Sequence, residues 1–319
     1  MTFRELAQPI QGIIPPMATP LAAADELDEA GVERLVEHLV AGGVHGLFLL
    51  GTCGEGPSLS LRLRRQLVER VTKQVDGRVP VLVSITDTSL AETLSAARHA
   101  ADAGADALVL APPYYYPVDQ AELVAYVLRV VGDAPLPMML YNMPSLTKLT
   151  FDTASVRRLI EVEAIVGLKD SSGDLEYFQS IRGLRSLRPD WTLLVGPEHL
   201  LAKSLELGGD GGVSGGANVW PQLFVQIYEA ALASSDTAIA EQNAVLRHLI
   251  DQADRLRSIY RIGPRTASSV IKGLKSALSV LGICGNHVAP PLVPHTPPER
   301  EQVAEILRSL GIGTAAATS

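Results

Sequence analysis

Short runs of apolar residues recur through the first two thirds of the chain and alternate with segments of helical spacing. The runs are continuous instead of alternating with polar residues, which is typical of parallel strands buried on both faces. They lie roughly 30 residues apart, about the length of one strand–helix unit. Eight runs predict eight strands, at Gly12–Met17, Gly46–Leu50, Val79–Ile85, Ala107–Ala111, Pro137–Tyr141, Ile165–Lys169, Thr192–Gly196 and Gly212–Ser214.

The segments between these runs predict amphipathic helices. One apolar stripe occupies Leu27–Val40 and stops at Gly42, a residue typical of a helix C-terminus. A second stripe occupies Leu123–Val131. Ser89 followed by Glu92 predicts a capping box at the start of another helix. Strands and helices are therefore expected to alternate.

Two architectures accommodate such alternation: an open doubly wound sheet and a closed barrel. An open sheet usually carries a glycine-rich phosphate fingerprint after its first strand, whereas this chain has Pro15–Pro20 there. We therefore predict an α/β fold, a (β/α)8 TIM barrel over residues 1–233. Residues 234–319 show no clear strand pattern and predict a C-terminal helical region with a frayed tail at Thr314–Ser319.

Composition narrows the class of protein. Hydrophobic residues make up 47% of the 319 positions, enough for a large core, which excludes a disordered chain. The net charge of −8 argues against a nucleic-acid partner, since such proteins usually present a basic face. Cys53 and Cys284 are the two cysteines, so a disulfide scaffold is excluded. We expect no bound metal, because the seven histidines lack ligand spacing.

Membrane insertion is also not expected. The uncharged run Gly211–Tyr228 is interrupted by glycines, Asn218 and Pro221, and it lacks the uniform apolarity of a span. The first residues show no basic stretch followed by an apolar run. We therefore expect a cytoplasmic protein.

The active site of such a barrel lies at the carboxyl ends of its strands. Lys169 ends the apolar run Ile165–Leu168, so its strand is expected to carry it into the barrel mouth. Burial disfavours a bare ammonium, and a neutral amine forms Schiff bases with carbonyl compounds. The alternative is a lysine at a strand end whose ammonium reaches water.

Tyr141 precedes Lys169 by 28 residues, one strand–helix repeat, so the two are expected at the same level on neighbouring strands. A phenol there is suited to proton transfer, although a tyrosine that only packs is the alternative. The turn Gly51-Thr52-Cys53-Gly54 offers backbone N–H groups and a hydroxyl that suit a carboxylate. The aromatic run Tyr114–Tyr116 favours a binding or interface role.

Other chemistries find no support in the sequence. There is no Gly-x-Ser-x-Gly elbow, no P-loop and no acidic cluster at the predicted strand ends. The residues therefore point to carbonyl chemistry without a metal or a cofactor.

Together these motifs resemble the dihydrodipicolinate synthase/N-acetylneuraminate lyase superfamily of pyruvate-dependent class I aldolases. The most specific part is Tyr141–Pro144 followed by Gly167–Ser172. The order of Gly51–Glu55, Pro113–Pro117 and the glycine-rich Gly208–Asn218 supports the resemblance, which extends from about Gln11 into the C-terminal region.

The resemblance implies roles for individual residues. Lys169 would form the imine with pyruvate, and Tyr141, Thr52 and Tyr115 would form a proton relay. Tyr115 would come from the neighbouring subunit of a homotetramer, a dimer of dimers. Thr52 and Cys53, in the turn that begins at Gly51, would hold the pyruvate carboxylate. The backbone carbonyl of Val213 would face the substrate.

Departures from the family pattern concern the substrate. Cys53 replaces a threonine, and a thiol is the weaker donor. Leu146 stands where dihydrodipicolinate synthases carry the arginine that binds the aldehyde's carboxylate. Sialic acid lyases also have a leucine there. They differ from this chain in having an acidic pair at the positions of Glu198-His199 and a serine at the position of Gly215. The arginine that the family carries near its C-terminal proline run is also absent, since Gly285–Pro291 contains none. Arg265 is a further candidate to bind the aldehyde's carboxylate.

We therefore predict a Schiff-base-forming aldolase or lyase acting on a small-molecule 2-oxo acid, or on pyruvate plus an aldehyde. Glu198 and the Tyr114–Tyr116 loop are expected to shape the pocket for the second substrate, and Leu146 is expected to lie in it. The alternatives are 4-hydroxy-tetrahydrodipicolinate synthase proper and a 2-oxo sugar acid aldolase or dehydratase. A different class of protein, an inactive barrel used for binding, is disfavoured because Lys169 and Tyr141 occur together.

Overall fold

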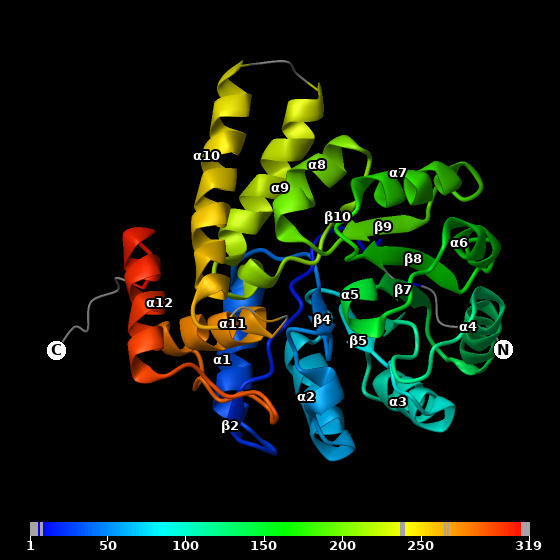
Figure 1. The fold of residues 1–319 in the computed structure, drawn as a ribbon, viewed down its shortest axis with the longest axis horizontal. Coiled ribbons are helices and arrows are strands. Elements are labelled where there is room, and N and C mark those ends of the chain that lie inside the picture. Colours follow the sequence, from blue (N-terminus) through cyan, green and yellow to red (C-terminus); the bar gives the residue numbers. More distant parts are fainter. Residues whose placement is uncertain (1–5, 7–8, 237–239, 265, 267, 314–319) are drawn as a thin grey trace.

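The computed structural model describes residues 6, 9–236, 240–264, 266 and 268–313. One parallel sheet forms the centre of the molecule, and helices surround it (Figure 1). Each of the eight predicted runs overlaps one strand of this sheet, although the last run shares only Gly212 with its strand. The strands are β1 (Gly12–Ile13), β4 (Leu47–Leu49), β5 (Val81–Ser84), β6 (Ala107–Leu110), β7 (Met138–Asn142), β8 (Ile165–Asp170), β9 (Thr192–Val195) and β10 (Gly211–Gly212).

The sheet curls back toward its first strand. Its order is β1-β10-β9-β8-β7-β6-β5-β4, with every neighbouring pair parallel. The segment after β1 also bonds to β4, since Met17 N–H donates to Phe48 O at 2.9 Å and Phe48 N–H donates to Pro15 O at 3.0 Å. A second, antiparallel pair of short strands is formed by β2 (Leu21–Ala23) and β3 (Glu26–Leu27).

Helices follow the strands and cover the outside of the sheet (Figure 1). The α-helices are α1 (Glu29–Ala41), α2 (Leu61–Val75), α3 (Leu90–Asp102), α4 (Gln120–Asp133), α5 (Pro144–Thr147), α6 (Thr153–Leu159), α7 (Leu175–Gly183), α8 (Leu201–Glu206), α9 (Pro221–Asp236), α10 (Ala240–Leu256), α11 (Ser269–Val280) and α12 (Pro297–Ser309). The 3-10 helices are η1 (Gly56–Ser58), η2 (Leu184–Ser186), η3 (Glu198–Leu200), η4 (Gly215–Asn218) and η5 (Arg257–Arg261).

The helix predictions hold in outline, although Leu27, the first residue of the predicted stripe, lies in β3 and α1 begins at Glu29. Ser89 caps α3 by accepting from the Glu92 N–H at 3.4 Å, but the expected box is only half formed. The Ser89 N–H donates instead to Asp87 Oδ1 at 3.1 Å, because this carboxylate lies two residues away. Asp119 and Glu122 form a complete box at the start of α4.

The buried residues separate into two groups on the two sides of the sheet. The larger group packs the sheet against its helices. The smaller group lines the inner side and includes Phe48, Val109, Met139, Tyr141 and Leu194. A side chain of this inner group therefore points away from the helices, toward the space that the curled sheet encloses.

The C-terminal helices pack on the sheet's helical layer. Helix α10 packs against α9, and α11 packs against α12 and η5 (Figure 1). Helix α9 continues to Asp236, so a boundary at residue 233 falls within its last turn. The division into two domains stays a prediction, and the expected tail at Thr314–Ser319 lies outside the described residues. In the described part of the chain, no helix combines the length and apolarity needed to cross a bilayer.

Candidate active site

Strands β7 and β8 set Tyr141 and Lys169 side by side. Their Cα atoms are direct partners in the parallel register, as the 28-residue spacing predicts. One residue further along, Asn142 Nδ2 donates to Asp170 Oδ1 at 2.9 Å. This buried hydrogen bond joins the two strands directly beyond the tyrosine and the lysine, so it opposes any slip between them.

Lys169 lies in an aromatic and apolar environment. Its side chain is 4% exposed. Nζ lies 3.9 Å from the centroid of the Tyr141 ring and 4.8 Å from that of Phe48. A buried amine held beside a phenol can attack a carbonyl carbon, with the phenol close enough to move the protons.

The turn after β4 brings a hydroxyl to the same place. Thr52 Oγ1 lies 3.2 Å from the Tyr141 hydroxyl, and the two form a hydrogen bond. The turn is tightly wound: Leu50 and Glu55 both have left-handed φ angles, of 60° and 57°. A side chain at Gly56 would lie 2.0 Å from the Leu50 carbonyl oxygen, so this position requires glycine. Such strain is common at functional sites.

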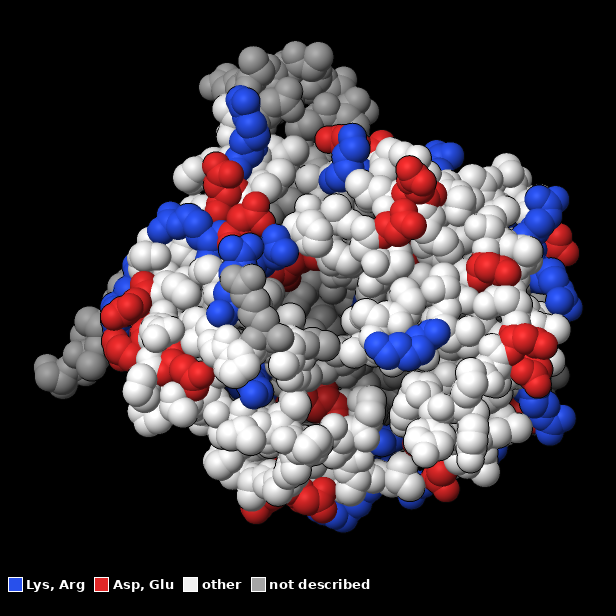
Figure 2. All heavy atoms as spheres, viewed as in Figure 1, with Lys and Arg blue, Asp and Glu red and all other residues white. Residues whose placement is uncertain are grey.

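A cavity of about 290 Å³ opens above these residues. Figure 2 shows a hollow near the middle of the face viewed there, with acidic and basic residues interspersed around it. Predicted site residues that line the cavity are Thr52, Cys53, Tyr141, Leu146, Lys169, Glu198 and Val213. Burial raises the pKa of Cys53 to about 12, so this residue presents a neutral thiol.

One wall of the cavity is acidic and incompletely paired. Glu198 Oε2 accepts from the Gly216 N–H at 2.8 Å, and Oε1 lies 3.7 Å from Arg257 Nε. Glu198 Oε1 and the buried Tyr260 hydroxyl have no well-formed hydrogen bond among the described residues. Burial raises the pKa of Glu198, against the opposing effects of the Gly216 N–H, the Arg257 charge and the Tyr260 hydroxyl. Buried polar atoms in this state are suited to a polar ligand.

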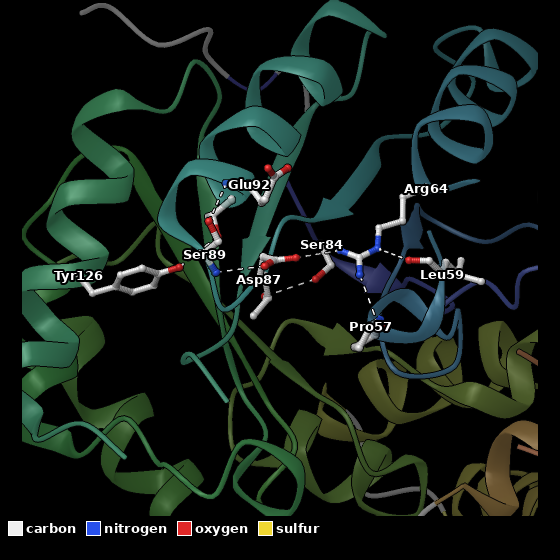
Figure 3. Close-up of polar contacts among 10 residues, drawn as sticks. Pro57, Leu59, Arg64, Ser84, Asp87, Ser89, Glu92 and Tyr126 are labelled. Atoms are coloured by element: carbon white, nitrogen blue, oxygen red, sulfur yellow. Dashed lines mark hydrogen bonds and ion pairs between the residues drawn. The ribbon is translucent and has the colours of Figure 1, made fainter. Parts of the chain in front are cut away.

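A second cavity, of about 280 Å³, adjoins the first and shares Thr52, Tyr141 and Leu146 with it. Gly51 lines this second cavity. So does Arg64, whose guanidinium lies 3.2 Å from Asp87 and donates to the carbonyl of Leu59 at 3.0 Å (Figure 3). The charge of Arg64 is therefore already paired within the protein.

Tyr115 is not brought to the cavity within one chain. Its side chain is 76% exposed, and its ring packs edge-on against Tyr116 at 5.1 Å. Tyr114, its other neighbour, lines the second cavity. The expectation that Tyr115 acts in a neighbouring subunit stays a prediction.

Arg257 and Tyr260 are cavity residues that the sequence analysis missed. Both lie on η5, in the predicted C-terminal region, and no motif marks them because they reach the cavity only through helix packing. Arg257 is also paired with Asp254 at 2.8 Å. Arg265, which the sequence suggested as a partner for the aldehyde's carboxylate, lies outside the described residues.

Comparisons with known proteins agree over nearly the whole chain. Residues 9–310 match the model of the Dihydrodipicolinate synthetase family. A putative 2-dehydro-3-deoxy-D-gluconate aldolase of Escherichia coli K12, YagE, is 33% identical over 302 residues, which cover 94% of this chain and 96% of the relative.

Two solved structures are similar in fold and sequence. A structure described as dihydrodipicolinate synthase from Bacteroides thetaiotaomicron is 44% identical, with a TM-score of 0.89 over 96% of this chain and 100% of that one. The structure of Escherichia coli YagE in complex with pyruvate is 31% identical, with a TM-score of 0.87 over 95% of this chain and 99% of that one.

Proposed function

The chain belongs to the dihydrodipicolinate synthetase family, and from this premise we propose that it cleaves a hydroxylated 2-oxo acid to pyruvate and an aldehyde. The protein is a pyruvate-dependent lyase of the class I aldolase type. We further propose which residues carry out the reaction and which class of substrate the enzyme takes. The polar wall formed by Glu198 and Tyr260, beside Lys169, is the observation that carries it, because Glu198 Oε1 and the Tyr260 hydroxyl have no well-formed hydrogen bond among the described residues.

We infer that the parallel sheet closes as a (β/α)8 barrel, and the bonds between Phe48 and the segment after β1 support this closure. We further infer a homotetramer in which Tyr115 reaches a neighbouring site; the exposure of its ring supports that role.

The two free cysteines fit the reducing cytoplasm. The imine on Lys169 would serve without a metal or a separate cofactor.

The first half of the proposed reaction forms the imine. The Lys169 amine attacks the C2 carbonyl of the 2-oxo acid, and a carbinolamine results. Tyr141 passes a proton to the oxygen that leaves as water, and its hydrogen bond to Thr52 supports a relay. The turn at Thr52 and Cys53 would hold the carboxylate through N–H groups and the Thr52 hydroxyl.

The second half breaks the carbon–carbon bond. The C4 hydroxyl gives its proton to Tyr141, the C3–C4 electron pair moves into the imine, and an aldehyde leaves. The resulting enamine takes a proton at C3, and water then releases pyruvate and the free Lys169 amine. Because the imine accepts the electron pair, no other electron acceptor is needed.

The class of substrate follows from the groups beyond the imine. Leu146 offers no charge to an anionic aldehyde, and the two arginines that line the cavities in the described part of the chain, Arg64 and Arg257, are already paired with carboxylates. Glu198 Oε1 and the Tyr260 hydroxyl instead suit the hydroxyl groups of a polyol chain. A 2-dehydro-3-deoxy sugar acid, the substrate class in the name of YagE, has such a chain.

The second candidate is 4-hydroxy-tetrahydrodipicolinate synthesis from pyruvate and aspartate semialdehyde. The 44% identical structure described as dihydrodipicolinate synthase favours it. This reaction would use the same imine and the same tyrosine, so the two candidates differ in the aldehyde and in whether the carbon–carbon bond is formed or broken.

The semialdehyde is expected to be the poorer aldehyde. A hydrogen bond to a charged group contributes about 1.5–3 kcal/mol, so lacking a guanidinium at Leu146 should lower kcat/KM about ten- to hundredfold. Steady-state kcat/KM for pyruvate plus aspartate semialdehyde, measured against a panel of 2-dehydro-3-deoxy sugar acids and neutral aldehydes, tests this. Leu146→Arg should raise kcat/KM for aspartate semialdehyde. A native semialdehyde value well above all others would restore the synthase assignment.

Glu198→Gln is expected to lower kcat/KM for the preferred hydroxylated substrate about ten- to hundredfold. The amide oxygen keeps the Gly216 contact, while the second carboxylate oxygen is replaced by an NH₂ group, which cannot accept from a substrate hydroxyl. Trapping of pyruvate itself by borohydride should be unchanged, because pyruvate has no hydroxylated chain. Equal losses in both assays would mean that Glu198 supports the fold and does not select the substrate.

A further inference from the structure

A buried ion pair joins the C-terminal helices to the turn after β4. Lys275 Nζ on α11 lies 3.0 Å from Glu55 Oε1, and both side chains are 1% exposed. The two residues are 220 positions apart in the chain. Taking two charges out of water is costly, and an apolar pair of similar size is often at least as stabilising. Stability alone therefore does not explain why these two positions hold a charged pair.

The Lys275 ammonium is held by three neighbours. It donates hydrogen bonds to the carbonyl oxygens of His287, at 2.7 Å, and of Thr19. Its contact with Glu55 Oε1 is an ion pair without a well-formed hydrogen bond. The other oxygen of Glu55, Oε2, accepts from the Ala289 N–H at 2.6 Å. Four separate segments of the chain thus converge on one point, those of Thr19, Glu55, Lys275 and 287–289.

That point is the base of the turn that carries Thr52. The Glu55 N–H donates to the Thr52 carbonyl oxygen at 3.1 Å. Thr19, whose carbonyl holds Lys275, also donates its hydroxyl to the Gly54 carbonyl oxygen at 2.7 Å. Glu55 itself has the left-handed φ of 57°, which a residue other than glycine keeps only when its surroundings hold it.

We propose that Glu55 and Lys275 are positioning residues, which hold the Thr52–Cys53 turn at the height of Tyr141 and Lys169. They touch no reacting atom; they act through the turn, whose hydroxyl meets Tyr141 at 3.2 Å. The C-terminal helices are then part of the active-site scaffold. The inference rests on the proposed function, because it assigns this turn to the pyruvate carboxylate.

The direction of the bonds explains why a charged pair is used. Apolar side chains would fill the same space but would leave the turn free to shift by a fraction of an ångström. An ammonium that donates to two fixed carbonyl oxygens, paired with a carboxylate that has a backbone donor, restricts the turn more than apolar contacts would. Displacements of about 1 Å at a catalytic group can cost a hundredfold in rate.

The test is a variant that removes both charges at once, Glu55→Gln with Lys275→Met. Neither charge is left unpaired, so folding should survive. The measurement is borohydride trapping of pyruvate on Lys169 at increasing pyruvate concentration. We expect the half-saturating pyruvate concentration to rise about ten- to hundredfold, with the melting temperature close to native. Glu55→Gln alone, which retains an oxygen for Ala289, should shift saturation in the same direction.

Arg185→Met provides the matched control for lost stability. Arg185 lies 3.2 Å from Asp210, a partly buried pair at the opposite ends of the strands, where Asp210 also accepts from the Leu193 N–H near the start of β9 at 2.7 Å. This variant should lower the melting temperature and leave pyruvate saturation unchanged.

The outcomes separate the two proposals. If the native chain gives no pyruvate adduct, the proposed function fails, whatever the variants do. If the native chain gives the adduct, and Glu55→Gln or the double variant saturates at the native pyruvate concentration, the positioning role is overturned and the pair only stabilises the fold. The positioning role is also overturned if a variant of the Glu55–Lys275 pair and Arg185→Met have the same melting temperature and the same half-saturating pyruvate concentration.

Discussion

Lys169→Ala is expected to abolish the pyruvate adduct that borohydride traps on the native protein. The amine of Lys169 is buried beside the Tyr141 ring, in the cavity that also presents Thr52 and Glu198. Without a nucleophile the imine cannot form, so turnover should fall below detection. Intact-protein mass spectrometry after incubation with pyruvate and borohydride gives the stoichiometry, and peptide mapping gives the residue.

Lys148→Ala is the control for this experiment. Lys148 ends α5 close to the cavity, is exposed, and donates to the Ser145 carbonyl oxygen at 2.7 Å. It should leave the adduct at full stoichiometry. An adduct of native stoichiometry on Lys169→Ala would exclude the imine mechanism proposed for this chain.

Tyr141→Phe is expected to lower turnover about 10²–10⁴-fold, the usual contribution of a general acid or base. The ring stays to pack against Phe48, at 6.1 Å between centroids, so the fold should be retained. Only the hydroxyl that meets Thr52 at 3.2 Å is lost. Single-turnover measurement of imine formation, together with the steady-state kcat, shows which step depends on the phenol.

Tyr126→Phe removes a comparable hydroxyl from another part of the molecule. The Tyr126 hydroxyl on α4 bonds to Thr93 Oγ1 on α3 at 3.2 Å, away from both cavities. Its turnover should stay near native. Near-native turnover of Tyr141→Phe would instead reduce Tyr141 to a packing residue.

Local patterns were sufficient to predict the strands and the pairing at the reaction centre. Continuous apolar runs require burial on both faces, and all eight became strands of one parallel sheet. Since each strand–helix unit advances the chain by one strand, a spacing of one repeat places two residues on neighbouring strands. This is why Tyr141 and Lys169 were expected to be partners, and they are.

The turn after β4 was predicted only in part. Glycines near Thr52 indicated exposed N–H groups, and Thr52 does meet Tyr141. Nothing local indicated that Gly51 would face a second cavity while Cys53 faces the first. The direction of each residue in a tight turn depends on its φ and ψ angles, here including the left-handed Leu50 and Glu55, which residue types alone do not specify.

The sequence by itself therefore determined the order of elements, the parallel sheet, and the level at which Lys169 and Tyr141 lie, because these follow from period and spacing. Only the tertiary structure decided what surrounds them. Glu198 meets Arg257, and Glu55 meets Lys275, across long stretches of chain. Such pairs depend on how the C-terminal helices dock on the sheet, and helix docking is set by the packing of many side chains at once, which no local pattern records.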